Sequence, residues 1–330
     1  MRIAIVDTWA LRPYGAAGES QAGLGGTETT VIAVAEGLSA EAEVTLHQAA
    51  RAAPTPEGAP GLRCLPFVAD DLSALRGADR VIVINSDKVA AIIAKGMPEA
   101  RVTVWLHVVP GKRHRAMGQD LSELGVGIVC VSERHVALVR DRLHPSDVQM
   151  RAIYNPLPGG LSPDGTPRDP DRLFFASSPH KGLAEVIERF AEARAALPGL
   201  SLRIADPGYL DWPVDRLGDA GITVLGRLSR AQVIEEMRAA LCLFYPQTSF
   251  AETFGIVLAE ANAVGCPVLV HRGLGANDEV ASSGEQLVDG HDTGAIIRTL
   301  KKWRAEPPEV MGNPAFALEA VLDAWRAALA

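Results

Sequence analysis

The sequence has few cysteines, no long apolar segment and no excess of basic residues. Its four cysteines, Cys64, Cys130, Cys242 and Cys266, are far apart and form no CxxC pair. This pattern predicts buried thiols in a reducing compartment and argues against disulfides and cysteine-based metal sites. No apolar run approaches the roughly 18 residues of a membrane-spanning helix, and the segment MRIAIVD is typical of a strand and not of a signal peptide. We therefore expect a cytoplasmic protein, with contact at the inner face of a membrane left open.

The formal net charge is −8, which argues against a general nucleic-acid-binding protein because such proteins present a strongly basic face. The run Lys112-Arg113-His114-Arg115 is a local exception. A solvated turn is the simpler interpretation of this run, and a basic patch that contacts an anionic or membrane-bound partner is the alternative.

The length of 330 residues favours two domains, and 48 % hydrophobic residues are enough for two cores. Short Val- and Ile-rich runs alternate with helical patterns, as in a parallel, doubly wound sheet that is covered on both faces. The predicted strands are 3–6, 44–47, 62–66, 81–84, 102–106, 128–131, 151–153, 173–176, 202–205, 222–225, 241–245 and 268–270. The predicted helices are 27–38, 88–95, 133–143, 183–196, 230–240, 255–264 and 316–329.

Residues 155–171 carry five prolines and three glycines, too many for a packed element. We therefore predict an α/β protein with two doubly wound, Rossmann-like domains, residues 1–157 and 171–313, joined by a linker at 158–170. The two domains are expected to face a cleft. The Ala- and Leu-rich C-terminal segment 314–330 is expected to contain a helix that can pack back on the first domain.

A glycine-rich segment, Gly23-Leu24-Gly25-Gly26-Thr27-Glu28, lies between the first predicted strand and helix. Glycines let a ligand approach the backbone, and the N–H groups of a first helical turn attract anions. The spacing lacks the third glycine of the dinucleotide fingerprint, and the loop is far longer than the tight turn of such a site. Contact with a phosphate or another ligand and plain turn chemistry are equally favoured here.

Two glutamates, Glu252 and Glu260, surround the start of the helix predicted at 255–264. Glu252 has a purely structural explanation, because a negative charge near a helix N-terminus stabilises it by about 0.3–1 kcal/mol. Glu260 lies in a helix that looks buried nearly all round, where a carboxylate without partners costs several kcal/mol. At 1.5 Å rise per residue the two carboxylates lie up to about 12 Å apart. That spacing suits one extended ligand, with the helix N-terminus facing its phosphates.

Residues 252–270, ETFGIVLAEANAVGCPVLV, resemble the E-x7-E motif of the retaining glycosyltransferases of family 4, which have the GT-B fold. Further segments resemble the family's other motifs and follow in the same order along nearly the whole chain. These segments are Gly25-Gly26-Thr27-Glu28, Trp105-Leu106-His107, Val131-Ser132-Glu133, Tyr154-Asn155-Pro156, His180-Lys181-Gly182-Leu183 and Val224-Leu225-Gly226-Arg227-Leu228.

The resemblance implies a role for each matching residue. Lys181 would pair with the diphosphate of a nucleotide sugar, Glu252 would hold the transferred sugar, and His107 would lie close to its anomeric carbon. Glu260 would accept hydrogen bonds from the ribose hydroxyls. The other residues implied to contact the donor are Gly25 and Gly26 at the distal phosphate, Phe254, Gly255 and Ile256 through backbone N–H groups at the phosphates, and Gly226 and Arg227 at the base.

The chain departs from the family pattern in one place. The family has an arginine about half a dozen residues before the lysine, whereas this chain has Phe175-Ala176-Ser177-Ser178-Pro179-His180 before Lys181. Stabilisation of the leaving group therefore depends on Lys181 alone, on Ser177 and Ser178, or on an arginine from another segment.

The resemblance implies a retaining transferase that moves a sugar from a UDP- or GDP-sugar to a glycan, glycolipid or small-molecule acceptor, as in polysaccharide biosynthesis. No metal and no other cofactor are expected, because lysine and a helix terminus can stabilise the developing charge. No nucleic-acid partner is expected. Other readings stay open: another GT-B enzyme such as a sugar-nucleotide epimerase or a hydrolase, and a non-catalytic module that binds sugar nucleotides or a protein. A dehydrogenase is a distant alternative, because the glycine spacing does not fit one.

Overall fold

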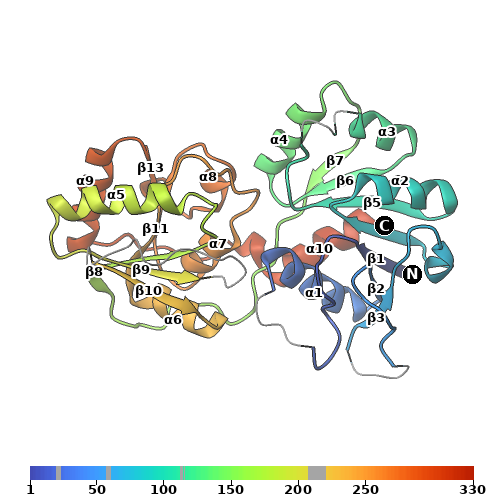
Figure 1. The fold of residues 1–330 in the computed structure, drawn as a ribbon, viewed down its shortest axis with the longest axis horizontal. Helices are drawn as coiled ribbons and strands as arrows, with labels where there is room; N and C mark the ends of the chain where they lie inside the picture. Colours follow the sequence, from blue (N-terminus) through green and yellow to red (C-terminus); the bar gives the residue numbers. More distant parts are fainter. Residues whose placement is uncertain (20–23, 57–60, 112–113, 115, 207–220) are drawn as a thin grey trace. The chain divides into compact units, whose positions relative to one another are not determined.

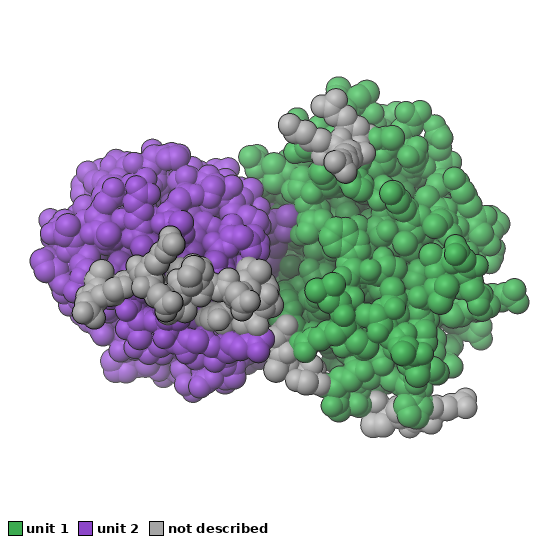
Figure 2. Space-filling view, viewed as in Figure 1, with its two compact units in different colours: residues 1–158, 315–330 green, residues 159–314 purple. Residues whose placement is uncertain are grey.

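The computed structural model describes residues 1–19, 24–56, 61–111, 114, 116–206 and 221–330. The chain divides into two compact units, Met1–Pro158 with Ala315–Ala330, and Gly159–Pro314 (Figure 2). Each unit contains one parallel sheet with helices on both faces, which confirms the predicted fold class. Among the helices of the described ranges, none combines the length and the apolar character needed to cross a bilayer.

The first unit has a seven-stranded sheet in the order β3-β2-β1-β4-β5-β6-β7. Its strands are β1 (Arg2–Asp7), β2 (Glu43–Gln48), β3 (Arg63–Pro66), β4 (Arg80–Ile84), β5 (Arg101–Leu106), β6 (Gly127–Cys130) and β7 (Met150–Ala152). Helices α1 (Gly26–Ser39) and α10 (Leu318–Leu329) pack together on one face. The other face is covered by α2 (Asp87–Gly96), α3 (Met117–Glu123) and α4 (Glu133–Leu143) (Figure 1).

The second unit has a six-stranded sheet in the order β10-β9-β8-β11-β12-β13. Its strands are β8 (Asp169–Ala176), β9 (Ser201–Asp206), β10 (Ile222–Arg227), β11 (Ala240–Tyr245), β12 (Val268–His271) and β13 (Leu287–Val288). Helices α5 (Leu183–Ala196) and α9 (Thr293–Ala305) contact each other on one face, and α6 (Arg230–Ala239) and α7 (Ile256–Ala263) contact each other on the opposite face (Figure 1). A short helix, α8 (Asn277–Val280), packs against α7.

The C-terminal helix packs on the first unit, which the sequence left open as a possibility. Trp325 of α10 contacts Trp105 of β5 edge to face, with ring centroids 4.7 Å apart. Helix α1 presents Gly37 to α10, and a Cβ atom at Gly37 would lie only 2.5 Å from Leu322. The absence of a side chain at Gly37 therefore allows the two helices to approach closely.

Several elements differ from the prediction: α3, α8, α9 and β13 were not predicted, and β8 has a different start. Strand β8 begins at Asp169, which pairs with Ala240, so the strand starts earlier than the predicted 173 and includes the end of the segment predicted as a linker. Helix α9 was not predicted, although Ile296, Leu300 and Trp303 form a buried stripe at helical spacing. All four cysteines are free and buried, which confirms the prediction of unpaired thiols.

Candidate functional site

The candidate site lies at the carboxyl ends of β8 and β11, where the strand order of the second sheet reverses. From β8 the chain proceeds to β9 and β10 on one side, and from β11 it proceeds to β12 and β13 on the other. The loops that follow two such strands separate and leave room for a ligand, which is why open α/β sheets bind ligands at this point. Lys181 lies in the loop after β8, and Glu252 lies in the loop after β11.

Lys181 and Glu252 form a partly buried ion pair at this point. The Lys181 Nζ atom donates to both carboxylate oxygens of Glu252, at 3.0 Å each. The exposed fraction of the side chain is 27 % for Lys181 and 7 % for Glu252. Tyr245, the last residue of β11, donates its hydroxyl to Oε1 of Glu252 at 3.1 Å. The structure therefore brings together two residues that the resemblance assigned to the donor site.

Burial and the neighbouring Glu252 charge both raise the pKa of Tyr245 far above its usual range, and a side-chain hydrogen bond from Ser177 acts in the opposite direction. The phenol is therefore neutral at all ordinary pH values and acts as a hydrogen-bond donor to the carboxylate. Ser177 is thus engaged with Tyr245, at the start of the segment that leads to Lys181.

The loop that carries Glu252 is fixed by backbone contacts. The carbonyl oxygen of Glu252 accepts a hydrogen bond from the Ala276 N–H at 2.9 Å. A Cβ atom at Gly275, where φ is +54°, would lie 2.3 Å from that same carbonyl oxygen. A larger residue at Gly275 would displace the Glu252 backbone, so this glycine is required by close packing as well as by its left-handed conformation.

A fully buried amide organises the preceding turn. The Gln247 side chain accepts hydrogen bonds from the backbone N–H groups of Ser249 and Phe250 and donates to the Phe250 carbonyl at 2.8 Å. These bonds hold the Phe250 ring under the Lys181 ammonium, which lies 4.9 Å from the ring centroid. The ring supports the cation through its π face while leaving the ammonium partly exposed.

Glu260 lies on α7 and is held by an arginine. The Arg230 Nη2 atom donates to Oε1 of Glu260 at 2.5 Å, and the exposed fraction of the side chain is 47 % for Arg230 and 11 % for Glu260. Burial raises the pKa of Glu260, and the Arg230 charge and hydrogen bond oppose that rise. Arg230 is the first residue of α6, which Ser229 caps through its hydroxyl. The carboxylate thus has the partner that its burial requires.

Helix α7 begins at Ile256, after Gly255 with φ of +86° at the cap position. No side chain caps this end of the helix. The backbone donors of its first turn are therefore not satisfied by a capping side chain, as an anion-binding helix terminus requires. Phe254, just before it, is buried and anchors the turn.

Gly226 and Arg227 end β10, and Gly226 has φ of +68°. They lie at the same carboxyl edge of the sheet as Lys181 and Glu252, two strands away from β8. Their contact with a base stays a prediction.

In the first unit, His107 directly follows β5 at the carboxyl edge of the sheet. Its backbone N–H donates to Oδ1 of Asn85, the residue after β4, at 2.7 Å. Burial, together with the neighbouring His135, lowers the pKa of His107 to about 3. The imidazole is therefore neutral at physiological pH, and its proximity to a sugar stays a prediction.

Gly25 and Gly26 form the start of α1, with Gly25 at the cap position. A Cβ atom at Gly25 would lie 2.7 Å from Oε2 of Glu28, so the Glu28 carboxylate folds back over this glycine. Gly23 of the same segment, and Lys112, Arg113 and Arg115 of the basic run, lie outside the described residues.

Sequence reasoning missed four residues of the site: Arg230, Tyr245, Gln247 and Phe250. Tyr245 ends a strand whose other residues are apolar, and the polar Gln247 follows two positions later. Polar side chains at the end of an apolar strand are a signal that could have indicated a ligand site there. Arg230 gave no comparable signal, because an arginine in the first turn of an exposed helix is common.

Comparisons with known proteins support a glycosyltransferase. Residues 172–313, which lie within the second unit, match the family model described as glycosyl transferases group 1. The D-inositol 3-phosphate glycosyltransferase of Mycolicibacterium smegmatis is 33 % identical over 144 residues, which are 40 % of this chain and 32 % of that protein. The corresponding protein of Streptomyces coelicolor is 34 % identical over 107 residues, or 32 % of this chain and 23 % of its own length. The matched part thus spans a third or less of these relatives.

Solved structures match the whole fold. The trehalose-6-phosphate synthase OtsA superposes with a TM-score of 0.71 at 12 % identity, over 100 % of this chain and 99 % of that chain. The lipopolysaccharide outer core galactosyltransferase WaaB superposes with a TM-score of 0.63 at 14 % identity, over 98 % and 95 % of the two chains. The two Rossmann-like units therefore have the fold of GT-B glycosyltransferases.

Proposed function

We propose that the protein is a retaining, metal-independent glycosyltransferase of the family 4 type. It transfers a sugar from a UDP- or GDP-sugar to a glycan, glycolipid or small-molecule acceptor. The observation that carries the proposal is the partly buried Lys181–Glu252 pair at the point where the strand order of the second sheet reverses. This pair lies within the segment that matches the group 1 glycosyltransferase model.

In the proposed reaction the bond between the anomeric carbon and the diphosphate breaks, and the acceptor oxygen forms the new bond. Negative charge develops on the leaving diphosphate, and donors already held in place lower the barrier most when they point at that charge. Lys181 supplies a positive charge that Glu252 and Phe250 hold in position. The start of α7 supplies backbone N–H groups that no side chain caps.

Calorimetry with UDP and GDP tests the site. We expect one of the two to bind the wild-type protein, and Lys181→Met to weaken that binding by about 10- to 150-fold, because a hydrogen bond to a charged group contributes about 1.5–3 kcal/mol. Glu260→Ala should weaken binding through loss of the ribose contact. Lys301→Met is the matched control, since Lys301 is exposed on α9. Unchanged affinity in both Lys181→Met and Glu260→Ala would exclude the proposed site.

A non-catalytic or divergent sugar-nucleotide-binding protein is the second candidate, and one observation favours it. Among the described residues, the Lys181 ammonium donates only to Glu252, and Arg230, an arginine of the same unit, contacts Glu260. Product analysis with a panel of donors and acceptors separates the two functions. Binding without turnover supports the second candidate, and conversion of the donor without an acceptor supports an epimerase or a hydrolase.

Metal independence is part of the proposal, and chelation tests it. Among the described residues, His271, Asp289 and His291 form a group whose potential metal-ligand atoms lie within 4.8 Å of one another. The Nδ1 atom of His271 already accepts a hydrogen bond from the Gly290 N–H at 2.9 Å, which disfavours a metal at that nitrogen. Transfer should persist in EDTA, and loss of transfer that added Zn²⁺ or Mg²⁺ restores would contradict the proposal.

A further inference from the structure

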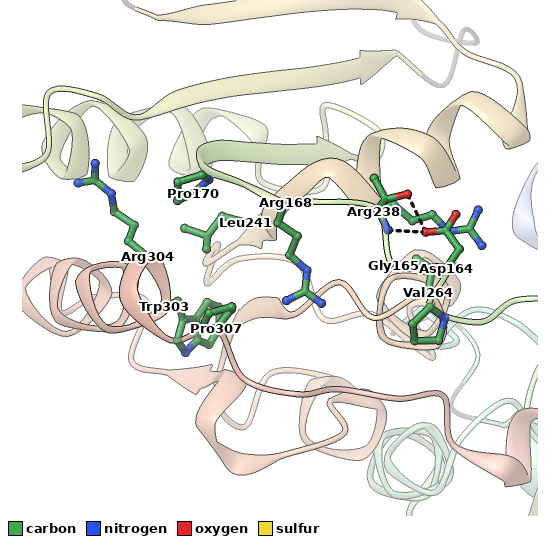
Figure 3. A pocket seen from close by; sticks show the side chains of 12 residues that line it. Asp164, Gly165, Arg168, Pro170, Arg238, Leu241, Val264, Trp303, Arg304 and Pro307 are labelled. Carbon is green, nitrogen blue, oxygen red and sulfur yellow. Dashed lines mark hydrogen bonds and ion pairs between the residues drawn. The ribbon is translucent and has the colours of Figure 1, made fainter.

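A cavity lies at the amino ends of β8 and β11, at the edge of the sheet opposite to Lys181 and Glu252. Its volume is about 480 Å³, within the range of small-molecule sites. The walls come from the segment that precedes β8, from the ends of α6 and α9, and from the residues after α7 and α9 (Figure 3). All of these residues belong to the second unit.

One wall of the cavity is apolar and rigid. Leu241, Val264 and Trp303 line it and are themselves at least 97 % buried, and Pro307 completes this wall. The three buried side chains form a rigid base, and the apolar surface open to a ligand comes from exposed lining residues such as Pro170 and Pro307.

Two of the three arginines that line the cavity are already neutralised. Arg238 pairs with Asp164 at 3.2 Å and donates to the Ser162 carbonyl at 2.9 Å. Arg304 pairs with Asp171 at 2.5 Å. Both arginines lie in the last turn of their helix, where a positive charge also interacts favourably with the helix dipole. Their positions are therefore explained by the fold.

Arg168 is different. Its guanidinium donates one hydrogen bond, to the Gly265 carbonyl. No carboxylate pairs with Arg168 among the residues that the structure describes, although a guanidinium has five N–H donors. Figure 3 shows the side chain extending from the strand edge into the space in front of Pro307. Burial raises the pKa of the Cys266 thiol to about 12, and the positive charge of Arg168 opposes that rise. The Arg168 charge therefore acts on a buried group of the unit.

We propose that this cavity binds a small organic anion, a carboxylate or phosphate group on a compact apolar body, and that Arg168 contacts the anionic group. An unpaired, half-buried guanidinium beside an apolar wall recognises such a ligand, because the fork of donors matches the two oxygens of the anion. The site is separate from the proposed nucleotide-sugar site, so it does not depend on that function.

Calorimetry with phenyl phosphate and benzoate tests the proposal, and the comparison shows which anionic group is preferred. At least one probe should bind the wild-type protein with a Kd of about 1 mM or lower. Arg168→Met should weaken that binding by about tenfold or more, since it removes the charge and keeps the apolar stem. Arg168→Gln removes the charge and retains an N–H donor for the Gly265 carbonyl, so it gives the same test if Arg168→Met is unstable. Benzyl alcohol, which has the apolar body without the charge, should bind at least tenfold more weakly.

Lys181→Met is the matched control, because a phosphate probe could also bind at Lys181. Probe binding should be the same in Lys181→Met and in the wild-type protein. The proposal is overturned if neither probe binds, if benzyl alcohol binds equally well, if both Arg168 variants bind like the wild type, or if Lys181→Met loses the binding. Failure of UDP and GDP to bind would contradict the proposed function and leave this result unaffected.

Discussion

Removal of Arg230 is expected to destabilise the second unit in a pH-dependent way. Within the described ranges, the Glu260 carboxylate has one hydrogen-bond and ion-pair partner, the Arg230 guanidinium at 2.5 Å, and the Glu260 side chain is 11 % exposed. Loss of one partner of a buried ion pair costs about 3–5 kcal/mol. Because the Arg230 side chain is 47 % exposed and water already screens it, we expect a smaller cost of about 1–2 kcal/mol at pH 8 for Arg230→Met.

The sign of the pH dependence follows from the pKa of Glu260. Burial raises that pKa in the wild-type protein, and Arg230 opposes the rise, so Arg230→Met should raise it further. A carboxyl group with a raised pKa in the native state binds more protons there than in the unfolded chain, so its cost appears as the pH rises. The cost is absent below the unfolded pKa of about 4.3 and complete above the native pKa. The variant should therefore approach wild-type stability as the pH falls from 8 towards 4.5.

Thermal unfolding at pH 8 and pH 5 measures the effect. For a unit of this size about 1 kcal/mol corresponds to about 2–4 °C, so the transition of the second unit should fall by roughly 2–8 °C at pH 8 and by clearly less at pH 5. Glu260→Gln is the control background, because no charge remains there to lose its partner. An equal loss of stability at both pH values, or an equal loss in the Glu260→Gln background, would refute the reasoning.

Three further predictions concern packing, titration and loop order. Gly37→Ala should destabilise the first unit by about 1–3 kcal/mol in denaturant unfolding, because the new Cβ would lie 2.5 Å from Leu322, whereas Gly159→Ala meets nothing within 4 Å and should be nearly neutral. His107 should remain neutral in NMR titrations from pH 8 to pH 5, and its suppressed protonation should reduce stability as the pH falls from about 6.5 towards 3; a midpoint near 6.5 would contradict this. Gln247→Ala should cost about 1–3 kcal/mol and weaken nucleotide binding, because three partly buried backbone groups lose their partner; retained stability and affinity would show that the amide does not order the turn.

The fold was largely predictable because most strands contain a short apolar run between helical patterns, and β1, β4, β5, β6 and β12 are rich in Val and Ile. Helix α9 was missed, although its signal was present: Asp292 caps the helix through a bond from the Ala295 N–H, and Ile296, Leu300 and Trp303 follow at helical spacing. Charged residues surround these three side chains, so the composition of the segment does not reveal the buried stripe. Strand β13 has only two residues, too few for any periodicity.

The site was predictable in part, and the reason is topological. Lys181 and Glu252 are 71 residues apart, and no spacing rule joins them. They meet because each follows one of two strands that are adjacent in the sheet and distant in the chain. The pair Arg230 and Glu260 is similar, because α6 and α7 pack on the same face of the sheet. The order of the strands in the sheet therefore decides which cation pairs with a buried carboxylate. The residue pattern alone does not reveal that order.

Both carboxylates of the site are paired with a cation of the protein. A diphosphate that approaches Lys181 would share an ammonium already bound by two oxygens of Glu252, and a ribose at Glu260 would share a carboxylate already bound by Arg230. Ligand binding in such a site is an exchange of partners. The measured binding free energy is therefore the gain from the new contact minus the loss from the weakened ion pair. Removal of a cation then has two separate consequences: the ligand loses a contact, and a buried carboxylate loses its partner. The second consequence acts on the free protein as well, which is why stability and affinity must be measured together before a loss of binding is assigned to a lost contact with the ligand.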